Sequence, residues 1–79
     1  MNYKILIVDD EPANLRTIER LLRADFEVLT AGSGAAALEM ISRYDIALIV
    51  SDQRMPGMTG VEFLKRAAVV RPQTVRIML

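Results

Sequence analysis

Two groups of acidic residues in this sequence follow apolar runs, and their side chains could act together. Asp9 and Asp10 come directly after Lys4–Val8 (KILIV), and Asp52 follows Ile46–Val50 (IALIV) with one serine between them. Short runs rich in branched apolar residues are typical of strands that are covered on both faces, as in parallel sheets. Carboxylates placed where such strands leave the interior could bind a cation or act as nucleophiles.

The first acidic group also has a purely structural interpretation. Asp9, Asp10 and Glu11 precede Pro12, which is tolerated in the first turn of a helix because its missing N–H is no loss there. Acids before a helix can cap its free N–H groups and interact favourably with its dipole. Three acids in a row exceed what one cap requires, so the functional interpretation stands beside the structural one.

Composition limits the chemistry that is open to these acids. The 79 residues form one domain at most, and a hydrophobic content of 52% argues against disorder. The sequence contains no Cys and no His, which excludes a disulfide framework, thiol chemistry and the usual zinc sites. Any metal site must therefore be built from oxygen atoms, which favours hard cations such as Mg²⁺.

Charge and hydropathy indicate where the chain works. Ten basic and ten acidic residues cancel, so neither nucleic acid nor an anionic membrane is an expected partner. The N-terminal segment MNYKILIVDD lacks the apolar length of a signal peptide or a membrane span. We therefore expect no membrane association and a cytoplasmic location.

Four apolar runs alternate with three helical patterns, which predicts an α/β fold. Gly32-Ser33-Gly34 could suggest a phosphate loop, but it lacks the Walker lysine and the dinucleotide-binding spacing, so Ser33 is interpreted as a helix N-cap. The expected strands are Lys4–Val8, Phe26–Ala31, Ile46–Val50 and Thr74–Leu79, and the expected helices run from Pro12 to about Leu22, from Ala35 to Ser42, and from a cap at Thr59 to before Pro72.

The segment after Asp52 has the features of a constrained loop that leads into a helix. Its Pro-Gly pair at 56–57 is typical of a turn, and Thr59 and Glu62 have the T-x-x-E spacing of a capping box. The apolar residues that predict the buried side of this helix are Val61, Leu64 and Ala68, with Phe63 beside them.

Alternation of this kind predicts parallel strands joined by right-handed helical crossovers. In the flavodoxin-like order 2-1-3-4, a crevice opens at the carboxyl ends of the first and third strands, and Asp9, Asp10 and Asp52 would meet there. Two unit charges about 4 Å apart interact by roughly 1 kcal/mol in water and about 4 kcal/mol at an effective dielectric constant of 20. Folding must tolerate this repulsion, protonate a carboxylate or bind a cation. An acidic pocket that holds Mg²⁺ beside an exposed carboxylate suits phosphoryl transfer.

The segments ILIVDDEPANLR, IALIVSDQRMPGMTGVEFLKR and TVRIML closely resemble the receiver domain of bacterial two-component response regulators. The resemblance covers essentially the whole chain, so residues 1–79 are expected to be the N-terminal portion of one receiver domain. It rests on the paired acids, on the strand that leads to Asp52, and on the motif D-x-x-M-P-G-M-x-G. It implies a flavodoxin-like doubly wound parallel sheet that lacks the last helix, strand and helix of the family.

The resemblance also implies a function and a set of site residues. Asp52 would be the phosphoacceptor, which takes a phosphoryl group from a sensor histidine kinase and passes the signal to an output domain or partner, with no enzyme activity of its own. Asp10 would bind Mg²⁺ directly, Asp9 directly or through water, and Asp52 and the backbone carbonyl of Arg54 would complete the protein ligands. The Arg54 side chain would lie near the phosphoryl group and could tune the lifetime of the phosphorylated state.

Members of that family continue after the fourth strand with a Thr or Ser, a helix, a strand carrying a Lys, and a last helix. This sequence ends at Leu79, and neither Lys4 nor Lys65 is at a position to replace that Lys. We therefore expect the fourth strand to be an unpaired edge with exposed apolar surface, and the chain to self-associate by edge pairing or by exchange of elements.

Two alternative functions belong to different classes. A non-phosphorylated interaction module, or pseudo-receiver, would bind its partner without using Asp52. A Mg²⁺-dependent phosphohydrolase would use an aspartate nucleophile, and such enzymes often carry a second acid two residues on. Asp9 and Asp10 are adjacent instead, so the sequence favours the phosphohydrolase least.

Overall fold

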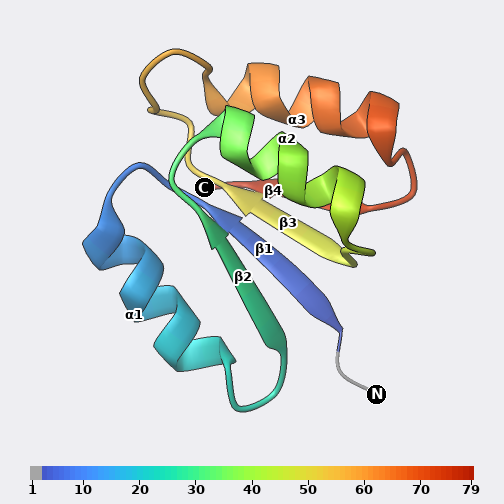
Figure 1. Ribbon diagram of the computed structural model, residues 1–79. Helices are drawn as coiled ribbons and strands as arrows, with labels where there is room; N and C mark the ends of the chain where they lie inside the picture. The colour runs from blue at the N-terminus through green and yellow to red at the C-terminus, as the bar shows by residue number, and fades with distance from the viewer. Residues whose placement is uncertain (1–2) are drawn as a thin grey trace.

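A four-stranded parallel sheet with three covering helices makes up the computed structural model, which describes residues 3–79 (Figure 1). The strands lie in the order β2-β1-β3-β4, which confirms the predicted flavodoxin-like arrangement. The first two residues of the expected domain lie outside the described range. The elements in chain order are β1 (Lys4–Val8), α1 (Pro12–Leu22), β2 (Glu27–Ala31), α2 (Gly34–Arg43), β3 (Leu48–Ser51), α3 (Gly60–Val70) and β4 (Val75–Met78).

The ends of some elements differ from the predicted ones by one or two residues. β2 begins at Glu27 rather than Phe26, and β3 begins at Leu48 rather than Ile46. Ile46 is nevertheless buried, and the backbone N–H of Ala47 donates to the carbonyl of Lys4 over 2.9 Å. The segment before β3 is therefore already attached to β1, although its residues do not yet take part in the ladder.

The helices divide between the two faces of the sheet, with α1 on one face and α2 and α3 on the other (Figure 1). Side chains alternate between the faces along a strand, so Leu6 and Val8 point to the α2–α3 side, and Ile5 and Ile7 to the α1 side. The main core lies on the α2–α3 side and comprises Leu6, Val8, Ala31, Ala37, Ile41, Ile46, Ile49, Met55, Phe63 and Ala67. No residue of α1 is buried, so its face of the sheet is covered less completely.

The buried side of α3 differs from the predicted one. Phe63 and Ala67 are fully buried, whereas Val61 is 37% exposed and Leu64 and Ala68 are half-buried. Residues four apart share one helix face, and Phe63 and Ala67 meet this condition as well as the predicted set does. The prediction was therefore wrong about Val61 and Ala68, whereas Leu64 packs against the core as expected. Both sides of α3 carry apolar residues, and the contact with the sheet decides between them.

The outer strand β4 is much more exposed than its apolar sequence suggests. Three of its four residues are exposed, among them Val75, Ile77 and Met78. β4 pairs with β3 on one side, and within the described range no strand pairs with its other side. None of the three helices in residues 3–79 has the length and apolar character needed to cross a membrane.

Candidate functional site

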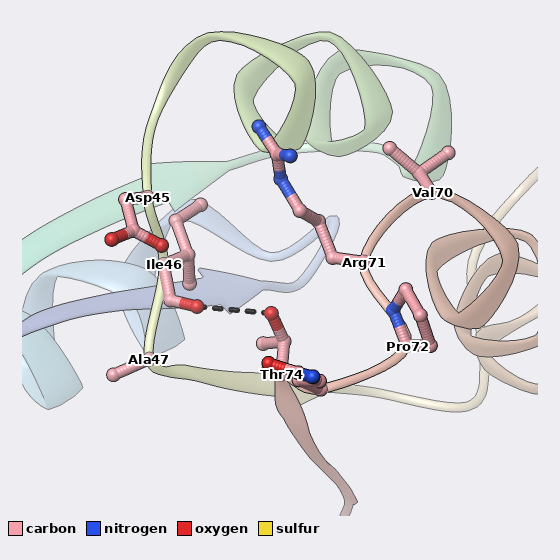
Figure 2. A pocket seen from close by; sticks show the side chains of 8 residues that line it. Asp45, Ile46, Ala47, Val70, Arg71, Pro72 and Thr74 are labelled. Carbon is pink, nitrogen blue, oxygen red and sulfur yellow. Dashed lines mark hydrogen bonds between the residues drawn. The ribbon is translucent and has the colours of Figure 1, made fainter.

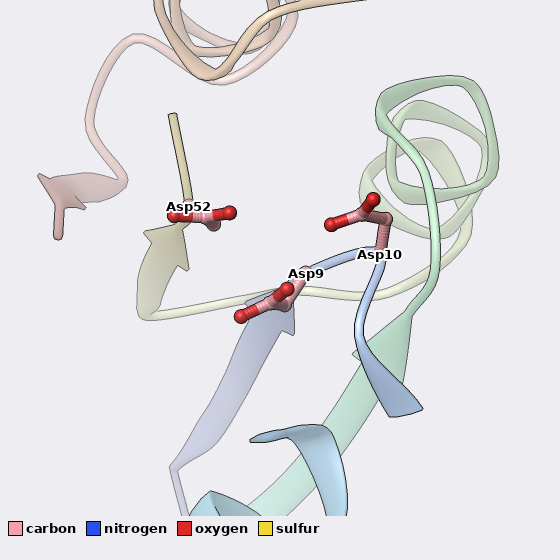
Figure 3. Close-up of side chains that lie close together, drawn as sticks. All are labelled: Asp9, Asp10 and Asp52. Carbon is pink, nitrogen blue, oxygen red and sulfur yellow. The ribbon is translucent and has the colours of Figure 1, made fainter. Parts of the chain in front are cut away.

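Three carboxylates that follow two neighbouring strands meet at the carboxyl-terminal end of the sheet. One carboxylate oxygen from each of Asp9, Asp10 and Asp52 lies within 4.8 Å of the others. Figure 3 shows the carboxylates of Asp10 and Asp52 turned toward each other, with Asp9 at the end of β1 beside them. Asp9 is 6% exposed, Asp52 is half-buried and Asp10 is exposed, so the group passes from the interior to the solvent.

Backbone hydrogen bonds extend the sheet to these acids. The N–H of Asp9 donates to the carbonyl of Ala31 on β2 over 3.1 Å, and the N–H of Asp52 donates to the carbonyl of Val8 on β1 over 2.9 Å. The parallel register pairs Val8 with Ser51, so the residues that follow each strand are neighbours as well. The closeness of the acids therefore follows from strand pairing, and it is independent of any bound ion.

The carboxylate of Asp9 is held by the start of α1. Its Oδ1 accepts a hydrogen bond from the backbone N–H of Glu11 over 2.9 Å, and its Oδ2 accepts one from the Asn14 side-chain amide over 3.2 Å. The N-cap residue Glu11 makes no side-chain capping hydrogen bond, so the predicted capping is not found there. Asp9 instead accepts from the free N–H of Glu11 at the helix start. Sequence reasoning missed Asn14, although an amide in the first turn of a helix that follows paired acids was a usable signal.

The loop after Asp52 returns close to the backbone of Asp52 before α3 begins. A Cβ added at Gly60 would collide with the carbonyl oxygen of Asp52 and would lie 2.9 Å from the Cα of Gln53. The N–H of Gly60 donates to the carbonyl of Gln53, and the N–H of Val61 donates to the Gln53 side chain, each over 3.0 Å. Only glycine fits at position 60, and the close approach fixes where α3 starts relative to Asp52.

The remainder of this loop is fixed by turn and capping residues. Gly57 has a φ of 81°, a conformation that glycine adopts without strain. The predicted capping box at the start of α3 is confirmed: the N–H of Glu62 donates to Thr59 Oγ1 over 3.2 Å, and Glu62 Oε1 accepts from the Thr59 N–H over 3.3 Å. The loop that carries Asp52 is thus anchored at both ends.

The same loop also rests on the start of α2. A Cβ added at Gly34 would lie 2.8 Å from the sulfur of Met58, so the absence of a side chain at Gly34 makes room for Met58. Ser33 caps α2 by accepting a hydrogen bond from the N–H of Ala36 over 3.1 Å, which confirms its interpretation as an N-cap. The Gly-Ser-Gly segment therefore has a structural role that accounts for its composition.

Arg54 is exposed and lies two residues after Asp52, in the loop between β3 and α3. The nearness of its backbone carbonyl to the three carboxylates, and of its side chain to a phosphoryl group, stay predictions. The assignment of Asp9, Asp10 and Asp52 as metal ligands, and of Asp52 as phosphoacceptor, also stays a prediction at this point.

The donor set fits a magnesium ion in its chemistry. Mg²⁺ prefers oxygen ligands at about 2.0–2.1 Å, so two ligands on opposite sides of the ion are about 4.2 Å apart. The carboxylate oxygens lie within 4.8 Å of one another, a spacing that small side-chain rotations could close. The three negative charges repel one another, and a divalent cation would relieve that repulsion.

A separate hollow lies at the opposite end of the sheet, between the starts of β3 and β4 (Figure 2). It has a volume of about 550 Å³. Two of its lining residues are joined by a hydrogen bond, in which Thr74 Oγ1 donates to the carbonyl of Ile46 over 3.0 Å. Asp45 and Arg71 are its charged lining residues, and Arg71 Nε donates to the carbonyl of Ile41 over 3.2 Å. Among residues 3–79, Asp45 is the one acidic residue in its lining, so the chemistry is better placed at the other end of the sheet.

Comparison with known proteins agrees with this geometry. The family described as the response regulator receiver domain matches residues 5–79. The hydrogenase transcriptional regulatory protein HoxA of Cupriavidus necator is 43% identical over 75 residues, which cover 95% of this chain and 16% of HoxA. The chain therefore spans about one sixth of the length of that relative.

Solved structures show the same fold. A CheY-like response regulator receiver domain protein from Methanospirillum hungatei matches with a TM-score of 0.95 and 33% identity, over 99% of this chain and 63% of that one. The response regulator TrrA from Thermotoga maritima, solved in complex with Mg²⁺-BeF, matches with a TM-score of 0.91 and 28% identity, over 96% of this chain and 67% of that one. The chain belongs to the response regulator receiver domain family of two-component phosphorelay signalling.

Proposed function

We propose that this chain is a phosphoacceptor module in which Asp52 takes a phosphoryl group from a sensor histidine kinase, with Mg²⁺ held by the neighbouring acids. The observation that carries the proposal is the meeting of Asp9, Asp10 and Asp52 at the carboxyl ends of β1 and β3. Receiver domains are in general signalling modules rather than enzymes, and we assign no turnover of a separate substrate to this chain.

The three acids have different surroundings, which supports different roles. Asp52 is half-buried at the end of a central strand, and within residues 3–79 its carboxylate accepts no hydrogen bond from a side chain or a backbone N–H. An oxygen of this carboxylate can therefore approach phosphorus, forming the O–P bond as the bond from phosphorus to the donor nitrogen breaks. Asp10 is exposed and faces Asp52, which suits a direct metal ligand (Figure 3).

The Mg²⁺ ion would be held by Asp10, Asp52 and the Arg54 carbonyl, with Asp9 acting directly or through water. When bound, the ion supplies positive charge that offsets the negative charge of the carboxylates and of the incoming phosphoryl group. The anchored loop between Asp52 and Gly60 keeps the acceptor at a fixed distance from the start of α3. A change of charge at Asp52 would then pass to the output domain or partner through this loop and α3.

The direct test is to incubate the purified chain with acetyl phosphate and Mg²⁺ and to measure the intact mass. We expect one added phosphoryl group in the wild type, none in Asp52→Asn, and slower addition in Asp9→Asn and Asp10→Asn. Asp45→Asn is the matched control, because Asp45 is an exposed aspartate near the opposite end of β3. Labelling that persists in Asp52→Asn, or a wild type that is never labelled, would contradict the proposal.

The exposed strand β4 favours a second role, which is association with another copy of the chain. Val75, Ile77 and Met78 are all more than 40% exposed, and the outer edge of β4 pairs with no strand in residues 3–79. Unpaired edges with apolar side chains are sites where a second chain can add to a sheet. We propose that two copies pair through β4.

Sedimentation equilibrium at micromolar concentration tests this pairing. We expect a dimer in the wild type and a monomer in Val75→Lys, because a charge on an edge strand opposes strand addition. Val69→Lys is the control, since Val69 is 84% exposed on α3, away from the strand edge. A monomeric wild type, or a dimer that Val75→Lys leaves unchanged, would contradict pairing through β4.

A further inference from the structure

Asn14 donates a hydrogen bond to the acidic group and has no role in the proposed function. It lies in the first turn of α1, and its amide donates to Asp9 Oδ2 over 3.2 Å, five residues back along the chain. Asn14 is exposed, whereas Asp9 is 6% exposed, so the contact joins a surface helix to a buried carboxylate. The amide therefore reaches the site from the surface, through Asp9.

We propose that Asn14 is a positioning residue, which holds the Asp9 carboxylate in the orientation that the divalent cation requires. This inference rests on the proposed function, because it concerns the same cation and the same acids. It adds that the affinity of the site for Mg²⁺ depends on the first turn of α1 as well as on the three aspartates.

Both carboxylate oxygens of Asp9 accept hydrogen bonds. Oδ1 accepts from the backbone N–H of Glu11 over 2.9 Å, and Oδ2 accepts from Asn14. The Glu11 bond alone fixes one oxygen and leaves the carboxylate able to rotate about that bond. The Asn14 bond fixes the second oxygen, and together the two bonds determine the plane of the carboxylate.

The Asp9 carboxylate keeps free acceptor positions beside its two hydrogen bonds. A carboxylate offers about four acceptor positions, so two hydrogen bonds leave capacity on each oxygen for a cation or for water bound to one. Groups that hydrogen-bond to a metal-binding carboxylate set its direction, and loss of such a group typically lowers metal affinity by about 10–100-fold. Asn14 is exposed and is one of two donors, so we expect an effect at the lower end, about tenfold.

The Asp10 and Asp52 carboxylates differ from that of Asp9 in their hydrogen bonding. Within residues 3–79, neither the Asp10 nor the Asp52 carboxylate accepts a hydrogen bond from another side chain or from a backbone N–H. Asp9 is therefore the fixed point of the acidic group, and the two other carboxylates can adjust around an ion. Two N–H dipoles directed at Asp9 also offset part of the charge repulsion before any ion binds.

The experiment is a Mg²⁺ titration followed by the backbone and side-chain amide signals in two-dimensional NMR, since the chain has no Trp for fluorescence. We expect the apparent dissociation constant for Mg²⁺ to rise about tenfold in Asn14→Ala. Thr17→Ala is the matched control, because Thr17 Oγ1 donates to the carbonyl of Ala13 within the same helix and contacts no acid of the site. Its affinity for Mg²⁺ should be unchanged.

A double-mutant cycle separates positioning from a general effect on the helix. If Asn14 acts through Asp9, then Asn14→Ala should weaken Mg²⁺ binding in the wild type and have no further effect in Asp9→Ala. The signals of the Asn14 side-chain amide should also shift in Asp9→Ala without any metal present. Equal weakening in both backgrounds, or an unchanged affinity in Asn14→Ala, would overturn the inference.

Other variants in the same titration test the proposed Mg²⁺ site separately from the role of Asn14. If Asp10→Asn and Asp52→Asn lose Mg²⁺ binding while Asn14→Ala keeps it, the proposed site stands and the positioning role is overturned. If wild-type chain shows no saturable Mg²⁺ binding, or if Asp10→Asn and Asp52→Asn bind as tightly as wild type, the cation site itself fails and the role of Asn14 fails with it.

Discussion

β1 and β4 have similar sequences, yet they differ sharply in burial. Both are short parallel strands that consist mainly of apolar residues, KILIV in β1 and VRIM in β4. Four of the five residues of β1 are buried, whereas no residue of β4 is buried. β1 has a strand on each side and a helix on each face, while β4 has one neighbouring strand within residues 3–79. Burial is therefore set by what surrounds a strand and not by its composition.

The candidate site belongs to the crowded centre of the molecule. Asp9 and Asp52 follow the two middle strands, and the loop after Asp52 packs against the starts of α2 and α3. The outer strand β4 instead has exposed apolar side chains, and its outer edge is unpaired within residues 3–79. The candidate site thus lies in the closely packed part of the molecule, and the exposed part is suited to contacts with another chain.

The largest expected effect on stability comes from comparing one apolar residue of β1 with one of β4. Leu6→Ala removes a fully buried side chain from β1, and we expect a loss of about 3 kcal/mol in the free energy of unfolding. Ile77→Ala removes a side chain that is 44% exposed in β4, so the loss should stay near 1 kcal/mol or below. Urea unfolding followed by circular dichroism measures both. Similar losses for the two variants would show that β4 is buried in solution.

Glycines extend the contrast to the loops. Gly60→Ala places a methyl group against the backbone of Asp52, and overpacking of this kind typically costs about 1–3 kcal/mol. Gly32→Ala meets no atom within 4 Å, so we expect a change within about 0.5 kcal/mol. The same unfolding measurement compares them. If Gly60→Ala is as stable as Gly32→Ala, the close approach at the start of α3 does not persist in solution.

A smaller effect is expected where the crowding atom belongs to a flexible side chain. Gly34→Ala would force Met58 to move, at an expected loss of about 1 kcal/mol in unfolding free energy. Met58→Ala removes the obstructing sulfur, so the added cost of Gly34→Ala should disappear in the double variant. Additive losses would show that Gly34 and Met58 do not contact each other, and that the loop after Asp52 lies away from α2.

Local features of the fold could be predicted from the sequence because they depend on neighbouring residues. The caps at Ser33 and Thr59 use partners three residues away, and both are confirmed. The apolar runs predicted all four strands, and the alternation of strands and helices restricted the possible topologies. The strand order then followed from the rule for doubly wound sheets and from the resemblance, and it placed the acids at one edge.

Features that depend on how elements pack could not be predicted in this way. The buried side of α3 was assigned to Val61, Leu64 and Ala68, with Phe63 beside them. Phe63 is buried and Leu64 packs against the core, but Ala67 is buried in place of Val61 and Ala68, because apolar residues lie on both sides of the helix. The contact between Gly34 and Met58 joins residues far apart in the sequence, and no local pattern indicates it.

The smallest expected effect concerns an ion pair between β1 and β2, on the side of the sheet away from β4. Lys4 on β1 and Glu27 on β2 are directly paired across the strands, with 3.2 Å between Nζ and Oε2 and side-chain exposures of 34% and 52%. Exposed pairs of this kind typically contribute about 0.2–1 kcal/mol. A double-mutant cycle with Lys4→Met and Glu27→Gln should give a coupling of about 0.5 kcal/mol at low salt. The coupling should fall toward zero at 1 M salt, where the Debye length is about 3 Å. Lys65→Met with Glu27→Gln is the additive control. A coupling that survives high salt would mean that the Lys4–Glu27 pair is shielded from solvent and would contradict its exposed character.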